Sequence, residues 1–401
     1  MFFISWSKSL TLLEFQEYGL WYLGIFTRWV AAPKIISLFS GCGGLDLPFH
    51  KSGYDLVWAN DFDESSCRTF ERNISKNIVH DSIENIDIDS IPDADIVVGG
   101  FPCQDFSQIW KKPGLDGTRG NLYTYFAEIV RKKTPEIFIA ENVRGLLSAN
   151  KGLAMETIIK DFRSLNPGYL VIPKLVNFSS YGLSQVRERV LIFGIRKDTA
   201  FNISFPAYTH GKNKLPLTTS KIGLKNISPK VLNQEHMNIQ PRTIEILKRI
   251  PAGGNFTAID KNDPYYVKGM ISHVYRRLHP DEPSKTIIAS GGGGTWGYHY
   301  PEPRALTNRE RARLQGFPDD FVFEGKFGEI RKQIGNAVPP AGIFQFVNSI
   351  TDYFNGDYES FDLNKIDEHI SQISIKNLMA KSNSDFNFYA SDLIDDNLFT
   401  S

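Results

Sequence analysis

Cysteine is scarce in this chain, which has only Cys42, Cys67 and Cys103 among its 401 residues. No two of them form a C-x-x-C pair, so neither a zinc site nor a disulfide framework is expected. The same scarcity predicts a reducing compartment, in which a reactive thiol can persist. No metal site is expected from the sequence.

An apolar run long enough to span a membrane is also missing. The aromatic N-terminal segment, residues 1–33, has a longest charge-free run of ten residues, Tyr18 to Thr27, against the roughly 20 that a bilayer requires. Glu14 and Glu17 interrupt the stretch that would be purely apolar in a signal peptide. We therefore expect an extension without an assigned role and no membrane partner.

Net charge is absent as well, because 45 Lys and Arg residues balance 45 Asp and Glu residues. The balance conceals a separation of charge along the chain. Residues 196–249 hold ten basic and three acidic side chains, whereas residues 352–401 hold three basic and ten acidic ones. Either stretch could be ordinary solvated surface, but the basic one could also contact phosphates.

From residue 34 onward, short β-rich runs alternate with amphipathic helices. This alternation predicts an α/β fold with a doubly wound sheet in residues 34–195. The expected strands cover 35–39, 56–59, 95–98, 136–140, 169–178 and 189–195, and the expected helices cover 46–52, 64–73, 122–130 and 153–165.

After residue 195 the alternation is lost. Pro, Asn, Lys and Gly predict a smaller irregular domain over residues 196–330, in which 275–278 and 283–288 suggest short strands around the glycines at 291–294. A return segment, 331–354, begins a helix at Pro339-Pro340 and rejoins the first domain. The acidic tail, 355–401, has little periodicity and is expected to be partly disordered.

The predicted strand at 95–98 ends in Gly99-Gly100-Phe101-Pro102-Cys103-Gln104. A buried parallel strand delivers its next side chain to the carboxyl-end rim of the sheet, where α/β proteins bind ligands. Here that side chain is Cys103, which is nucleophilic as a thiolate when nearby charge or N–H groups lower its pKa. An inert buried cysteine is the alternative, and the polar, Gly-bearing segment that follows favours the nucleophile.

A glycine turn, Phe39-Ser40-Gly41-Cys42-Gly43-Gly44, follows the first strand, and Asp61 ends the second. Glycines let the backbone approach a ligand, and a carboxylate at this place can accept two ribose hydroxyls. Dehydrogenases are the competing class. Their G-x-G-x-x-G pattern would need glycine at position 46, where this chain has Asp46.

Three further polar side chains are expected at the same rim. Glu141 ends the strand after the cysteine strand, so it should face whatever Cys103 attacks, and burial can raise the pKa of such a carboxyl enough for it to donate a proton. Arg187 and Arg189 are two residues apart and should share one face. One arginine could orient the glutamate and the other could meet a substrate anion.

Taken in order, these motifs resemble the DNA cytosine-5 methyltransferases, particularly the compact bacterial enzymes of restriction-modification systems. The resemblance covers residues 34–350 and rests on FSGCGG, the Asp61 strand end, GFPCQ, ENV, QVRER, RALTNRERARLQGFPDDF and QIGNAVPP. It implies a Rossmann-like methyltransferase fold that uses S-adenosylmethionine. It also implies that Cys103 attacks carbon 6 of a flipped-out cytosine while Glu141 protonates or hydrogen-bonds ring nitrogen 3, and that the methyl group goes to carbon 5.

The resemblance further implies the lining of the cofactor pocket. Phe39, Gly41, Gly43 and Leu45 would surround the methionine part of the cofactor. Asp61 would hold the ribose, Phe62 would lie against the adenine and Asp81 would bind the adenine amino group. The chain reads His80-Asp81-Ser82 where the family often has Gly-Asp-Ile. Leu122, Asn336 and Val338 would complete the cofactor pocket, with the segment from Gln333 returning from the C-terminal side to close it.

Residues 196–330 would then be a target recognition domain for duplex DNA, organised by a helix with Arg309, Arg311 and Arg313. The acidic tail could shield this basic region from non-specific DNA. A monomer in the bacterial cytoplasm is expected, with a cognate restriction endonuclease as its functional partner. The alternatives are a tRNA cytosine-5 methyltransferase and a catalytically inactive DNA-binding homologue.

Overall fold

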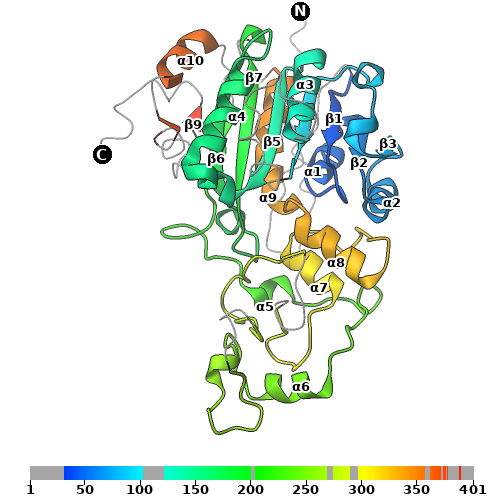
Figure 1. Ribbon diagram of the computed structural model, residues 1–401, viewed down its shortest axis with the longest axis vertical. Coiled ribbons are helices and arrows are strands. Elements are labelled where there is room, and N and C mark those ends of the chain that lie inside the picture. Colours follow the sequence, from blue (N-terminus) through cyan, green and yellow to red (C-terminus); the bar gives the residue numbers. More distant parts are fainter. Residues whose placement is uncertain are drawn as a thin grey trace, which may run out of the picture.

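A computed structural model describes residues 31–102, 122–199, 204–268, 274–289, 297–356 and 362–371, with residues 374, 375, 377 and 388–389. Cys103 and the glycine run 291–294 lie outside these residues. The molecule is elongated, with a sheet-containing body at one end and a smaller body of loops and short helices at the other (Figure 1). Among the described residues, no helix is both long and apolar enough to cross a membrane.

The larger body is built on a seven-stranded sheet in the order β3-β2-β1-β4-β5-β7-β6. Its strands are β1 (Lys34–Leu38), β2 (Asp55–Asp61), β3 (Ile78–His80), β4 (Ile96–Gly99), β5 (Ile137–Val143), β6 (Tyr169–Asn177) and β7 (Glu188–Arg196). β7 is antiparallel to both of its neighbours, whereas the other pairs are parallel. The α/β prediction is confirmed. It missed β3, a three-residue strand without a buried residue.

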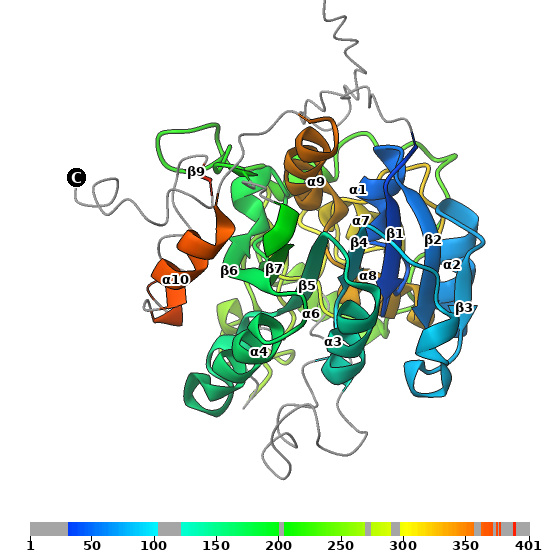
Figure 2. The same cartoon turned by 90° about the horizontal axis from the view of Figure 1, so that it is seen from above.

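Helices cover both faces of this sheet, as Figure 2 shows from above. Alternation along β1 explains the two layers, because Ile35 packs in one core cluster and Ile36 in the other. α1 (Asp46–Lys51) and α9 (Pro340–Phe354) contribute to the first cluster. α3 (Leu122–Lys133) and α4 (Leu153–Arg163) contribute to the second. The predicted double winding is therefore confirmed, and α9 packs beside α1 in the first core cluster.

The smaller body contains α5 (Ser220–Gly223), α6 (Pro241–Lys248), α7 (Asn308–Leu314) and α8 (Phe327–Asn336). The strands expected at 275–278 and 283–288 are wrong, since these stretches make only isolated bridges at Arg277 and Ser284. In the stretch 275–278, hydrogen bonds from one side chain stand where a β-ladder was expected. Arg277 is buried and donates hydrogen bonds to the carbonyls of Leu247, Ile250, His299 and Tyr300.

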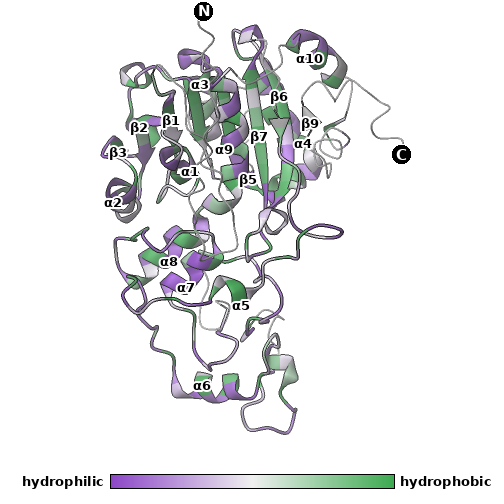
Figure 3. Ribbon diagram, turned by 180° about the vertical axis from the view of Figure 1, so that it is seen from behind, coloured by the Kyte–Doolittle hydropathy of each residue, from purple (hydrophilic) through white to green (hydrophobic). Residues whose placement is uncertain are grey.

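α7 is hydrophilic in composition (Figure 3) and yet buried. A capping box between Thr307 and Glu310 fixes its start. Arg309 donates to the carbonyls of Leu232, Pro318 and Phe321, and Arg313 pairs with Asp319 and donates to the carbonyl of Lys225. These arginines thus hold the surrounding loops together, as the sequence predicted for an organising helix.

Part of the acidic tail is folded. α10 (Leu363–Ser371) buries Leu363, Ile366 and Ile370 and packs against β6, and β9 (Phe388–Tyr389) pairs with β8 (Ser204–Phe205). Asp367 pairs with Lys197 and lies 3.8 Å from Nε of Arg163. In Figure 1, α10 and α6 lie at opposite ends of the molecule. The described part of the tail therefore does not cover the smaller body.

Candidate active site

The glycine turn begins where β1 ends, and it uses left-handed backbone at Phe39, Gly41 and Gly43, with φ of 54°, 55° and 89°. A Cβ on Gly43 would lie 2.0 Å from Cδ1 of Ile74, so a side chain there would strain the backbone and also displace Ile74. A Cβ on Gly41 would meet nothing within 4 Å. The Gly41 side of the turn therefore faces open space that a ligand can enter.

Asp61 lies beneath this turn at the end of β2 and is 8% exposed. Its Oδ2 accepts a hydrogen bond from the backbone N–H of Gly41 at 2.8 Å, and its Oδ1 accepts one from Asp63 at 2.9 Å. Burial raises its pKa, and the two N–H groups oppose that rise. The adjacent Phe62 side chain is 67% exposed, so its ring is available for stacking.

The return segment closes the other side of the turn. A Cβ on Gly44 would lie 2.4 Å from the carbonyl oxygen of Val338, so the two backbones touch. Gln333 fastens this segment to α2 (Glu64–Asn73) through Ser65 at 3.0 Å and Thr69 at 2.7 Å. Residues 333–338 therefore pack against the glycine turn, and their closing a cofactor pocket stays a prediction. Leu45 and Val338 are buried, whereas Asn336 is exposed.

The remaining expected cofactor residues lie at the rim. Leu122 begins α3 and is partly buried against the core. Asp81 is exposed, and its Oδ1 accepts hydrogen bonds from Ser82 N and Asn85 Nδ2, both at 2.7 Å. The hydrogen bond from Asn85 is the larger cause that lowers the pKa of Asp81.

β4 and β5 lie side by side and parallel, with Gly99 opposite Ala140. Their ends therefore meet, as predicted. A Cβ on Gly100 would lie 2.9 Å from Oε2 of Glu141, which brings this carboxylate against the backbone three residues before Cys103. The amide of Asn142 donates to the Phe101 carbonyl at 2.9 Å and ties the two strand ends together.

Glu141 is 8% exposed and forms an ion pair with Arg189, with 2.9 Å between Oε1 and Nε. Burial raises the pKa of Glu141, while the charges of Arg189 and Arg187 lower it. A carboxyl group whose pKa is raised by burial holds its proton more readily than an exposed one and can donate it to a partner. Burial and the ion pair with Arg189 thus suit Glu141 to act as a general acid.

Arg187 is fully buried and donates to the carbonyls of Ile287 at 3.0 Å, Gly335 at 2.9 Å and Ala337 at 3.0 Å. Of the two roles expected for the arginines, orienting the glutamate fits Arg189. Meeting a substrate anion does not fit Arg187, because the carbonyls and its burial keep the guanidinium from solvent.

Comparison with known proteins now identifies the family. A family model described as C-5 cytosine-specific DNA methylase matches residues 33–352. The chain belongs to this family. It therefore transfers a methyl group to carbon 5 of cytosine in DNA, and the resemblance drawn from the motifs is confirmed.

Two curated relatives cover most of this methylase. It is 56% identical over 339 residues to the Type II methyltransferase M.NgoFVII of Neisseria gonorrhoeae, across 83% of this chain and 90% of the relative. It is 40% identical over 369 residues to the Type II methyltransferase M.BbvI of Brevibacillus brevis, across 84% and 98%.

The fold is also similar to a solved structure, the Dnmt2 methyltransferase of S. pombe, with a TM-score of 0.54. The two are 15% identical, and the match covers 80% of this chain and 98% of that one. At this identity the likeness shows the fold alone.

The two described thiols of the methylase are not suited to act as nucleophiles. Cys42 and Cys67 are buried, and burial raises the pKa of both, to about 12 for Cys67. The Cys42 thiol donates to the Gln333 carbonyl, with 3.8 Å between the two atoms. Cys103 itself lies outside the described residues.

Asp46 follows the glycine turn, and its burial was not predicted from the sequence. Its side chain is 1% exposed, and its carboxylate oxygens accept no hydrogen bond from the described residues that meets normal geometry. Burial raises its pKa to about 7, and the nearby Ser37 hydroxyl opposes this rise. Periodicity alone could not show that a helix-starting aspartate would be buried.

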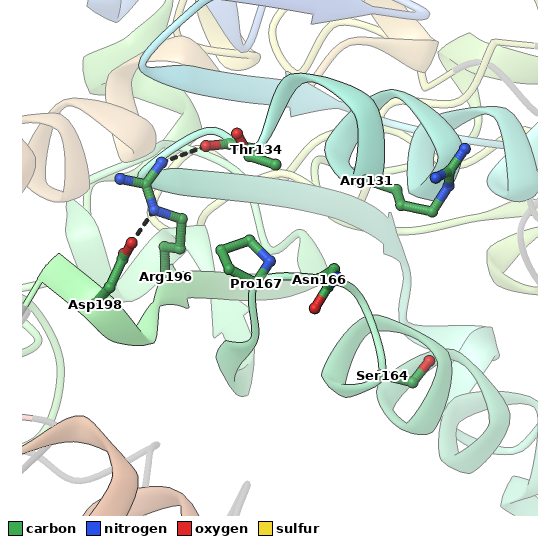
Figure 4. A pocket seen from close by; sticks show the side chains of 7 residues that line it. All are labelled: Arg131, Thr134, Ser164, Asn166, Pro167, Arg196 and Asp198. Carbon is green, nitrogen blue, oxygen red and sulfur yellow. Dashed lines mark hydrogen bonds and ion pairs between the residues drawn. The ribbon is translucent and has the colours of Figure 1, made fainter.

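A polar pocket of about 810 Å³ lies elsewhere on the methylase (Figure 4). It adjoins the last residue of the antiparallel strand β7 and therefore the amino ends of the parallel strands, away from Glu141. Its two arginines are already engaged, Arg131 by Glu128 and Arg196 by Asp198. It is lined by Arg131, Thr134, Ser164, Asn166, Pro167, Arg196 and Asp198.

The described residues also contain no cluster of metal-ligating side chains.

Proposed function

We propose that this methylase modifies one cytosine within a specific duplex DNA sequence through a covalent adduct of Cys103, as the modification enzyme of a restriction-modification system. The observation that carries the proposal is the position of Glu141, against Gly100 and in an ion pair with Arg189. The relatives named Type II methyltransferases support the biological setting. A cognate endonuclease and a place in the bacterial cytoplasm follow from that setting.

In this mechanism the Cys103 thiolate forms a bond to carbon 6 of the extruded cytosine. Ring nitrogen 3 gains electron density and takes a proton from Glu141, whose raised pKa suits this role. Arg189 keeps the carboxyl aimed while its proton moves. After methylation, the proton on carbon 5 leaves to a base, the bond from carbon 6 to sulfur breaks to release the Cys103 thiolate, and the proton on ring nitrogen 3 returns to Glu141. Unstacking the base costs a few kcal/mol, which contacts in the pocket offset.

The residues at the glycine turn fit S-adenosylmethionine. The open space beside Gly41 admits the ligand, the Asp61 carboxylate can accept hydrogen bonds from a ribose diol, and the exposed Phe62 ring can stack on adenine. When bound, the cofactor supplies an electrophilic methyl group. The residues proposed to hold it are Phe39, Gly41, Gly43, Leu45, Asp61, Phe62, Asp81, Leu122, Asn336 and Val338.

We further propose that residues 196–330 recognise the DNA. The excess of basic side chains in 196–249 supports phosphate contacts. Arg309, Arg311 and Arg313 are buried, so they shape the region and the exposed basic residues are left to meet the phosphates. Exchange of this region with that of a methylase of different specificity should move the methylated site.

The mechanism is tested with duplex DNA that carries 5-fluorocytosine at the target position. Fluorine cannot leave carbon 5 as a cation, so the enzyme should remain attached to the methylated base. The adduct should survive denaturing electrophoresis, require S-adenosylmethionine, form in Cys42→Ser and be absent from Cys103→Ser. An adduct on the peptide that contains Cys42 or Cys67 would contradict the proposal.

A further inference from the structure

A buried seam joins three stretches that are far apart in the sequence: residues 184–187 at the entry to β7, residues 284–289, and residues 335–338. Backbone hydrogen bonds join the first two, from Val186 to Ser284 at 2.8 Å and from Ser284 to Ser184 at 2.9 Å. The third stretch lies directly on the second, because a Cβ on Gly335 would be 2.2 Å from the backbone nitrogen of Ala289. A shift of 284–289 must therefore reach 335–338.

Two fully buried glutamines, Gln185 and Gln315, run through this seam. Gln185 Oε1 accepts from the Ile287 N–H at 2.9 Å, while its Nε2 donates to the Leu314 carbonyl at 3.1 Å and to Gln315 Oε1 at 2.6 Å. Gln315 Nε2 then donates to the Ala337 carbonyl at 2.6 Å. The two amides form a continuous relay from Ile287 to Ala337.

The relay has one self-consistent polarity. The N–H of Ile287 can only donate and the carbonyl of Ala337 can only accept, so reversing either amide would bring two donors or two acceptors together. Buried polar groups left unmatched in this way are costly. The direction of both side-chain amides is therefore fixed by backbone groups at the two ends.

Arg187 spans the same two ends. It donates to the carbonyls of Ile287 at 3.0 Å and Ala337 at 3.0 Å, and the planar guanidinium holds them in a set geometry. Ala337 precedes Val338, whose carbonyl touches the glycine turn at Gly44. The position of the seam is thus transmitted to the turn.

We propose that Gln185 and Gln315 are positioning residues that place the segment 335–338 against the glycine turn and couple it to the segment 284–289. S-adenosylmethionine and recognised DNA would then favour the same arrangement of the seam, so each would strengthen the binding of the other. The identity of the two ligands rests on the proposed function. The relay itself rests on the contacts of the described residues.

The test measures binding rather than activity. S-adenosylhomocysteine, which cannot be turned over, is titrated calorimetrically into the full chain with and without a duplex that contains the target sequence. Gln315→Met removes two hydrogen bonds and Gln185→Met removes three, and each leaves buried groups without partners, so each should weaken binding about tenfold. The increase in affinity that the duplex produces in the wild type should disappear in both variants. At saturating cofactor and DNA, kcat should change far less than KM for the cofactor.

Two controls separate positioning from general loss of stability. Ile158→Ala removes core volume beneath α4, and Gln345→Met alters a partly buried glutamine on α9 outside the seam. Both should bind S-adenosylhomocysteine as the wild type does. Since the two glutamines form one relay, the double variant should bind S-adenosylhomocysteine about as well as the single variant that binds it more weakly.

Several results would overturn the inference: unchanged binding in either single variant, losses that multiply in the double variant, an equal loss in Ile158→Ala, or a wild type whose cofactor affinity is indifferent to the duplex. A wild type that binds as expected but transfers no methyl group to DNA would instead contradict the proposed function.

Discussion

Arg189 on β7 and Glu141 on β5 form an ion pair across neighbouring antiparallel strands, with 2.9 Å between Nε and Oε1. The register sets Arg189 opposite Val143, so its side chain reaches back along β5 to the carboxylate two residues away. The two side chains are 13% and 11% exposed. The charge of Arg189 opposes the effect of burial on the pKa of Glu141, and the balance between them decides when this carboxyl holds a proton.

Arg189→Ala should raise the pKa of Glu141 further, because it removes the charge that most strongly opposes the effect of burial. Glu141 can donate a proton only while protonated, so the high-pH limb of the single-turnover rate should move to higher pH. Glu141→Gln does not titrate and should lose this limb, together with about 10²- to 10⁴-fold in rate. If the high-pH limb of the rate stays at the same pH in Arg189→Ala, a group other than Glu141 causes it.

Asp61→Ala should weaken S-adenosylmethionine binding by about 1.5–3 kcal/mol for each charge-assisted hydrogen bond lost, with DNA affinity nearly unchanged. It also frees the Gly41 N–H, which Asp61 holds at 2.8 Å. Calorimetry measures the cofactor affinity. The matched control is Asp87→Ala, an exposed aspartate whose side chain caps a single helical turn outside the pocket. Equal affinities in the two variants would remove Asp61 from the ribose site.

Asp46 should make the free energy of unfolding depend on pH. Its pKa is about 7 in the folded chain, above the value of about 3.9 expected when unfolded, so the folded state binds the proton more tightly. Its contribution to stability is therefore complete below about pH 4 and is lost as pH rises toward 7, at up to about 1.4 kcal/mol per pH unit. Asp46→Asn should stabilise the protein at pH 8 relative to the wild type. Urea unfolding at pH 5 and pH 8 measures the free energy of unfolding of both proteins. An equal change in this free energy between the two pH values in wild type and in Asp46→Asn would contradict the prediction.

Asp367→Ala should destabilise the protein by about 1–3 kcal/mol, because it leaves Lys197 and Arg163 without their shared carboxylate at a mostly buried site. Lys365→Ala is the control, since Lys365 lies 4.0 Å from Asp362 on the surface and its loss should cost less than about 1 kcal/mol. Thermal unfolding separates the two. Non-specific DNA affinity should be the same in both variants, because α10 lies far from the smaller body (Figure 1). A gain in affinity in Asp367→Ala would restore the idea of an electrostatic shield.

The sequence by itself determined the alternation of strands and helices in the larger body, apart from the short β3, and the meeting of the ends of β4 and β5. Both follow from local rules. The period of apolar residues sets the type and buried face of each element, and parallel neighbours bring their ends to one edge. The family motifs could be recognised for the same reason, since each is a short continuous stretch.

Only the tertiary structure decided the insertion of β7 between β5 and β6, the burial of Asp46, the bracing role of Arg187 and the relay through Gln185 and Gln315. Gln185 and Gln315 are separated by 130 residues in sequence, yet their amides lie 2.6 Å apart. No periodicity encodes such a contact. It arises because two segments that are each polar on their own exclude water together, and a buried amide must then find its partner wherever the packing of the chain provides one.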